Sequence, residues 1–112
     1  MKLDLSKYCA DVKHLHDIDK GRAIADELNV LSLFEGASGT QQQIVLCVPD
    51  SVYGISTSFV NGFFGSTVES LGKQVILKHL VIDAEDHIVL RVIDAIERAD
   101  VNIEQIRQAE LV

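Results

Sequence analysis

The sequence predicts a single α/β domain in which helices pack on a small, mixed β-sheet. Some segments show apolar residues with period two or in short unbroken runs, others show them at helical spacings, and the two kinds of segment alternate along the chain. The chain has 112 residues, of which 47% are hydrophobic, and this is enough for one core but not for two. We therefore expect one domain over residues 1–112, with roughly three or four strands and three main helices.

The N-terminal part is predicted to form a strand and then a helix. Residues 2–9 alternate polar and apolar side chains, as in an edge strand with one buried face. From Asp19 to Asn29 the apolar residues recur at helical intervals, and Asp17 or Asp19 can accept hydrogen bonds from the first free amides. Residues 30–43 include a run of small and polar residues and are expected to form a surface loop.

The middle of the chain is predicted to contain the central strand and the longest helix. Residues 44–48 are continuously apolar and rich in β-branched side chains, which is typical of a strand covered on both faces, and Pro49 ends it. Three consecutive hydroxyl residues then begin a helix whose apolar stripe continues to Gly72. Gly62 and Gly65 lie inside this helix at a cost of about 1 kcal/mol each, which favours close approach of another backbone.

The C-terminal part is predicted to hold a short helical turn, a strand and another helix. The turn covers residues 73–78, and the short buried strand covers 79–82. A strongly periodic helix follows over 83–97. Residues 100–112 show a weaker apolar period, compatible with a strand, a helix or a segment that docks on a second copy and so forms a homodimer.

Composition excludes several classes of function. The chain has 17 acidic and 10 basic residues, a net charge of −7, so its average field repels a phosphate backbone and we expect no nucleic-acid partner. No apolar run approaches the roughly 20 residues that cross a bilayer, and the N-terminus has no signal-peptide stretch. We therefore expect no membrane partner and a cytoplasmic location.

The cysteines and histidines do not form a recognisable catalytic or metal-binding pattern. Cys9 and Cys47 are expected to be small buried hydrophobic residues. His14 and His16 are two residues apart, a spacing that puts both on one face of a strand but on different faces of a helix. No further ligand completes a metal set, so they are expected to be surface histidines. The other two histidines lack an evident catalytic partner, and phosphate-loop, nucleophile-elbow and zinc-protease motifs are absent from the sequence. We expect no catalytic residues, no metal and no cofactor, and a protein that is not an enzyme.

The hydroxyl-rich helix start, Ser56, Thr57 and Ser58, is the most informative segment for function. At a helix start that follows a buried strand, the first backbone amides are unpaired and the positive end of the helix dipole is exposed. An anion or a phosphoryl group is therefore stabilised there. The hydroxyls can instead be simple helix caps, worth about 1 kcal/mol, and both interpretations remain open. Gly54 and Asn61 flank the segment, and Asn61 can face a partner or be an ordinary solvated residue.

This segment carries a resemblance to a known family. Residues 55–65 read Ile-Ser-Thr-Ser-Phe-Val-Asn-Gly-Phe-Phe-Gly, and Leu71-Gly72 follows at the expected helix end. Together with the apolar strand before it and the strand and helix after it, the run resembles the STAS-like domain family, related in fold to anti-sigma-factor antagonists. The resemblance covers residues 19–99 and implies a STAS-like fold.

The resemblance also implies a function. Proteins of this type dock on a partner with a histidine-kinase-like ATPase fold and are released when that partner phosphorylates a serine at the helix start. By position Ser58 is the best match to that serine, with Thr57 and Ser56 as alternatives, although Ile55 stands near where the family has an Asp. The leading hypothesis is a regulatory module that docks through residues 54–61, and the alternative is a sensor of a phosphate, nucleotide or carboxylate at the same helix start.

Overall fold

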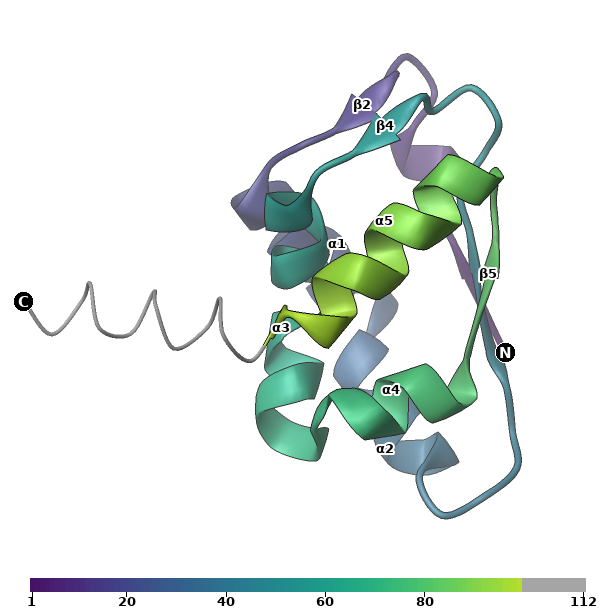
Figure 1. Ribbon diagram of the computed structural model, residues 1–112, viewed down its shortest axis with the longest axis vertical. Coiled ribbons are helices and arrows are strands. Elements are labelled where there is room, and N and C mark those ends of the chain that lie inside the picture. Colours follow the sequence, from purple (N-terminus) through teal and green to yellow (C-terminus); the bar gives the residue numbers. More distant parts are fainter. Residues whose placement is uncertain (100–112) are drawn as a thin grey trace, which may run out of the picture.

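The computed structural model describes residues 1–99, in which five α-helices lie on one side of a three-stranded sheet (Figure 1). The sheet has the order β1 (Lys2–Asp4), β3 (Ile44–Cys47), β5 (Leu80–Asp83). A second sheet pairs β2 (His14–Leu15) with β4 (Gly54–Ile55). The α/β class is confirmed, but every described strand pair is parallel rather than mixed.

The three-stranded sheet is covered on one face. Leu3, Leu46 and Ile82 stand in register and point toward the helices. On the opposite face Val45 is half-buried and Val81 is exposed, so the prediction of a strand covered on both faces is wrong. The physical reason is the strand order: both crossovers move in the same direction across the sheet, and right-handed crossovers then place all connecting helices on one side.

The first strand is shorter than predicted. Instead of continuing over residues 2–9, the chain leaves the sheet after Asp4, where the carboxylate Oδ1 accepts a hydrogen bond from the Ser6 amide at 2.9 Å. A single 3₁₀ turn over Ser6–Tyr8 follows. The alternating apolar residues are still used, because both Leu5 and Cys9 are buried in the core.

Two helices occupy the segment between β2 and β3. Helix α1 (Ile18–Leu28) begins as predicted, with Asp17 accepting a hydrogen bond from the Asp19 amide. Asn29 ends it in the left-handed conformation, and α2 (Val30–Ala37) starts at once. The predicted loop over residues 30–43 is therefore wrong in its first half, because apolar residues there recur at helical intervals and enter the core. The buried residues of α2 are Val30, Phe34 and Ala37.

The remaining helices agree with the sequence patterns. Helix α3 (Thr57–Leu71) ends at Gly72, whose φ of 85° favours glycine. Helix α4 (Lys73–His79) and helix α5 (Asp86–Glu97) occupy the predicted segments. His79 was expected to open a strand, but it is the buried last residue of α4. All four phenylalanines are buried in the core: Phe34, Phe59, Phe63 and Phe64.

Helices α1 and α3 cross at glycines. A Cβ built on Gly62 would overlap the carbonyl oxygen of Ile18, and a Cβ built on Gly21 would overlap that of Phe59. The close backbone approach predicted from glycines in α3 is therefore confirmed at Gly62. It is wrong at Gly65, where nothing lies within 4 Å of a built Cβ.

Three further expectations concern the chain as a whole. No helix within residues 1–99 combines the length and apolar character that spanning a membrane requires. Cys9 is buried as expected, whereas Cys47 is half-buried on the open face of the sheet. The expectations for residues 100–112, including a homodimer through them, lie outside the described residues.

Candidate functional site

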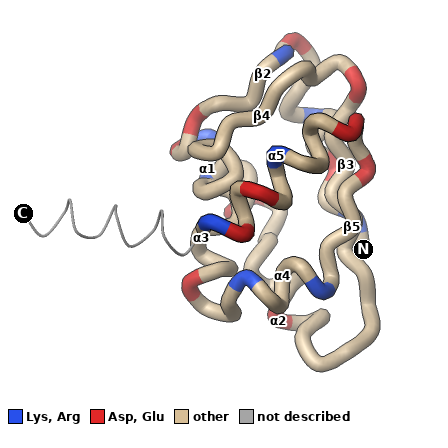
Figure 2. Tube along the Cα trace, viewed as in Figure 1, with Lys and Arg blue, Asp and Glu red and all other residues tan. Residues whose placement is uncertain are grey.

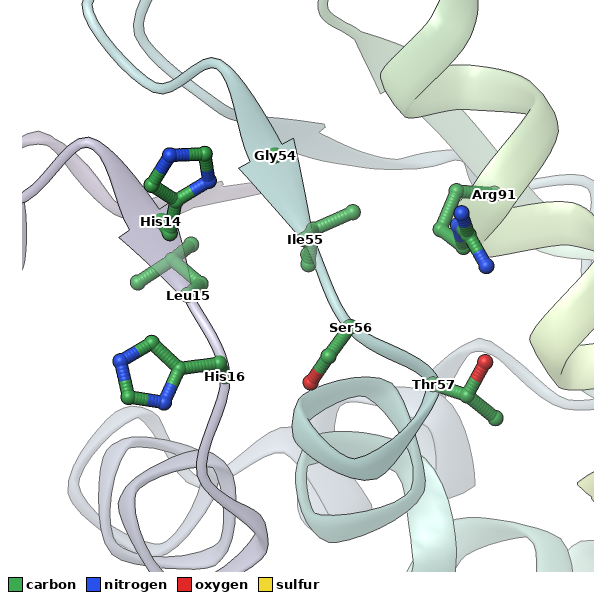
Figure 3. Close-up of a pocket in the computed structure, with 8 residues that line it drawn as sticks. All are labelled: His14, Leu15, His16, Gly54, Ile55, Ser56, Thr57 and Arg91. Atoms are coloured by element: carbon green, nitrogen blue, oxygen red, sulfur yellow. The ribbon is translucent and has the colours of Figure 1, made fainter.

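A shallow groove of about 310 Å³ opens at the start of α3 (Figure 3). It lies where the two-stranded sheet meets α3 and α5, so three segments distant in sequence contribute to it. Its lining residues are His14, Leu15, His16, Gly54, Ile55, Ser56, Thr57 and Arg91.

Main-chain hydrogen bonds hold the groove together. The Tyr53 amide donates to the Lys13 carbonyl and the Ser56 amide donates to the Leu15 carbonyl, each at 2.7 Å. These bonds pair β2 with β4 directly before α3 begins. The Ser56 hydroxyl oxygen accepts a hydrogen bond from the Phe59 amide at 3.0 Å, so of the three hydroxyl residues Ser56 is the one that caps the helix.

Basic side chains lie on both sides of the groove. Figure 3 shows His14 and His16 on one side, Arg91 on the opposite side, and the start of α3 below them. The His14 ring packs over Gly54, where a built Cβ would lie 2.7 Å from Nδ1. Arg91 forms no ion pair within residues 1–99, because Asp94 on the next turn is paired with Arg98 at 3.2 Å. Arg91 can therefore attract a negatively charged group into the groove.

Two exposed apolar side chains belong to residues that directly neighbour lining residues of the groove in the chain. Tyr53 is 59% exposed beside Gly54, and Leu90 is 70% exposed beside Arg91. The His87 Nε2 donates to the Tyr53 carbonyl at 2.7 Å and so ties the first turn of α5 to β4. We define the α3 surface as the groove together with its chain neighbours Tyr53, Ser58 and Leu90. It combines positive charge with exposed apolar area, as protein-binding surfaces do.

The structure brings most of the predicted site residues together. Gly54, Ser56 and Thr57 line the groove, and Ser58 is exposed on the first turn of α3. Asn61 does not line the groove. It is half-buried, and its Oδ1 lacks a hydrogen-bond partner within residues 1–99.

Sequence reasoning missed the three basic side chains of the groove as site residues. His14 and His16 were correctly expected to be exposed, and their spacing of two put them on one face of a strand. Arg91 is exposed on α5. What the sequence did not reveal is the pairing of two-residue strands that brings α5 and β2 to the same groove.

A second groove of about 310 Å³ lies at the carboxyl ends of the three parallel strands, a common ligand position in α/β folds. Three aspartates line it, and hydrogen bonds from Ser6 hold the pKa of Asp4 below its ordinary value. Desolvation by burial raises the pKa of Cys47, so its thiol stays protonated at neutral pH. Within residues 1–99 no three His, Cys, Asp or Glu side chains are placed to hold a metal ion.

We predict that Ser56→Ala lowers the free energy of unfolding by about 1 kcal/mol, because the amide of Phe59 loses its acceptor. Urea denaturation followed by circular dichroism measures the change. Ser58→Ala is the matched control: its side chain is exposed, and we expect its stability to stay within about 0.5 kcal/mol of wild type. Equal effects of the two variants would contradict the assignment of Ser56 as the cap.

No protein-family model, curated protein or solved structure matches the chain.

Proposed function

We propose that the chain is a regulatory, non-enzymatic docking module that binds a partner protein through the α3 surface. The observation that supports this most is the division of the three hydroxyls at the helix start. Ser56 is engaged as the cap, Thr57 lines the groove and Ser58 is exposed. Capping therefore explains one hydroxyl and leaves two open to an approaching protein.

The proposal extends to the kind of partner and the switch. The STAS-like resemblance favours a partner with a histidine-kinase-like ATPase fold. We place the chain and this partner in the cytoplasm, where ATP is present. Ser58 is the first candidate for phosphorylation because it is accessible, with Thr57 and Ser56 as alternatives. A phosphate there adds about two negative charges to the docking surface.

The test uses the purified chain and the purified histidine-kinase-like ATPase encoded nearest to its gene. We expect binding by isothermal titration calorimetry, and a mass increase of one phosphate on Ser58 after incubation with ATP. Ser58→Asp should weaken binding by about tenfold, equivalent to about 1.4 kcal/mol, because it places a permanent negative charge on the docking surface, as the phosphate would.

Ser66→Asp is the control, because Ser66 is exposed on the same helix beyond the groove. It should bind as the wild type does. If Ser58→Asp and Ser58→Ala both bind with wild-type affinity, the switch is refuted. If Ser58→Asp and Ser66→Asp weaken binding equally, the effect is one of total charge and not of the α3 surface.

A second candidate function is a sensor for a small anion, favoured by Arg91 facing the groove without an ion pair among the described residues. A ligand present at a hundred times its dissociation constant stabilises a protein by about 2.7 kcal/mol. Thermal shift with inorganic phosphate, compared between wild type and Arg91→Ala, tests this function. A stabilisation that disappears in the variant would favour the sensor over the docking module.

A further inference from the structure

The groove of the α3 surface is lined by an arginine and two histidines, although the chain as a whole is acidic. Figure 2 shows acidic positions around the first turn of α5, in the loops beside it and between β2 and α1. The groove itself is lined by Arg91, His14 and His16 and by no carboxylate. Lys13 adds a further cation, with its Nζ 5.8 Å from the centre of the Tyr53 ring.

Three of the carboxylates near these side chains in sequence have other contacts. Asp17 accepts a hydrogen bond from the Asp19 amide. Asp94 is paired with Arg98, and Glu85 lies 3.6 Å from His87 Nδ1. Within residues 1–99 neither Arg91 nor Lys13 forms an ion pair, so an incoming carboxylate would not have to displace one from these side chains.

We infer that the occupant of the α3 surface is an acidic segment of a partner protein that also presents an apolar side chain; this inference rests on the proposed docking function. The acidic side chain lies between Arg91 and the two histidines. The apolar side chain packs on Tyr53 and Leu90, which are 59% and 70% exposed. The mix of cations and apolar area fits a peptide segment better than a bare anion, because a bare anion leaves both apolar side chains in water.

Net charge opposes this contact at long range, but local charge determines the outcome. At physiological salt the Debye length is about 8 Å, so most of the −7 total is screened from a segment seated in the groove. A cation in direct contact with a carboxylate is screened much less. The same local charges explain how a phosphate on Ser58 would act, since its negative charge would compete with the acidic segment for the groove.

The experiment selects peptides from a phage-displayed random library on the immobilised wild-type chain, with Arg91→Glu as a parallel bait. We expect wild-type selection to enrich Asp and Glu beside an apolar residue. One selected peptide, made synthetically, should lose about tenfold in affinity for Arg91→Glu, equivalent to about 1.4 kcal/mol. Arg98→Glu is the matched control because Arg98 is also an exposed arginine at the end of α5, and its affinity should stay within twofold of wild type.

Amide chemical shifts of Gly54, Thr57 and Arg91 report where the peptide binds. Neutral or basic peptides that shift these amides and bind Arg91→Glu equally well would overturn the acidic preference while leaving the docking function intact. Peptides that shift none of these amides would refute the docking function itself. If inorganic phosphate produced the same shifts and displaced the peptide at equal concentration, the α3 surface would be a small-anion site, and the inference would be wrong.

Discussion

Gly62→Ala is expected to lower the free energy of unfolding by about 2 kcal/mol, although alanine is the better helix former by about 1 kcal/mol. The added methyl group would overlap the carbonyl oxygen of Ile18 and lie 3.0 Å from the Arg22 amide nitrogen. Both atoms belong to the backbone of α1, so no side-chain rotation can relieve the overlap. The two helices must separate, and the packing between them is lost.

Gly65→Ala is the matched control in the same helix. Nothing lies within 4 Å of its built Cβ, so the change should stabilise the protein by about 0.5–1 kcal/mol. Urea denaturation followed by circular dichroism compares both variants with wild type. A Gly62→Ala protein as stable as Gly65→Ala would show that α1 and α3 do not touch in the way described.

Phe64→Ala is expected to cost about 3–5 kcal/mol, a large share of the roughly 5–15 kcal/mol that holds a domain of this size together. The Phe64 ring is 1% exposed. It contacts two other rings edge to face, with centroids 6.1 Å from Phe34 and 4.8 Å from Phe63. Its removal leaves a cavity where α2 and α3 meet and ends both ring contacts.

Leu90→Ala provides the contrast for this measurement. Leu90 is 70% exposed, so truncating it should change the free energy of unfolding by less than about 0.5 kcal/mol. Urea titrations of the two variants compare the stability lost when a buried side chain is truncated with the stability lost when an exposed apolar side chain is truncated. A cost below about 1 kcal/mol for Phe64→Ala would contradict its placement in the core.

The sequence predicted the long elements because their patterns are local. A hydroxyl cap at the helix start, the apolar stripe of α3 and the stop at Gly72 each depend on neighbouring residues, and all three are confirmed. Helix α2 was missed because the Gly-Ala-Ser-Gly-Thr stretch suggested a loop, although Val30 and Phe34 already show helical spacing. A small-residue run proved weaker evidence than the apolar period beside it.

The candidate site could be predicted in part. Gly54, Ser56 and Thr57 line the groove and adjoin one another in the chain. Arg91 comes from a distant helix, and its place beside them depends on the pairing of β2 with β4, two residues each. Strands of that length have no detectable period, so the sequence alone does not place the two sides of the groove.

The crossing of α1 and α3 at Gly21 and Gly62 has a kinetic consequence for docking. The backbone of α1 at Gly21 lies against the carbonyl of Phe59, which is within one turn of the cap residue Ser56. The first turn of α3 therefore has little freedom to tilt before a partner arrives. A visiting segment thus meets a preorganised shape and spends little ordering entropy on this side of the interface. Changes in affinity among related partners should then appear mainly as differences in residence time rather than in association rate.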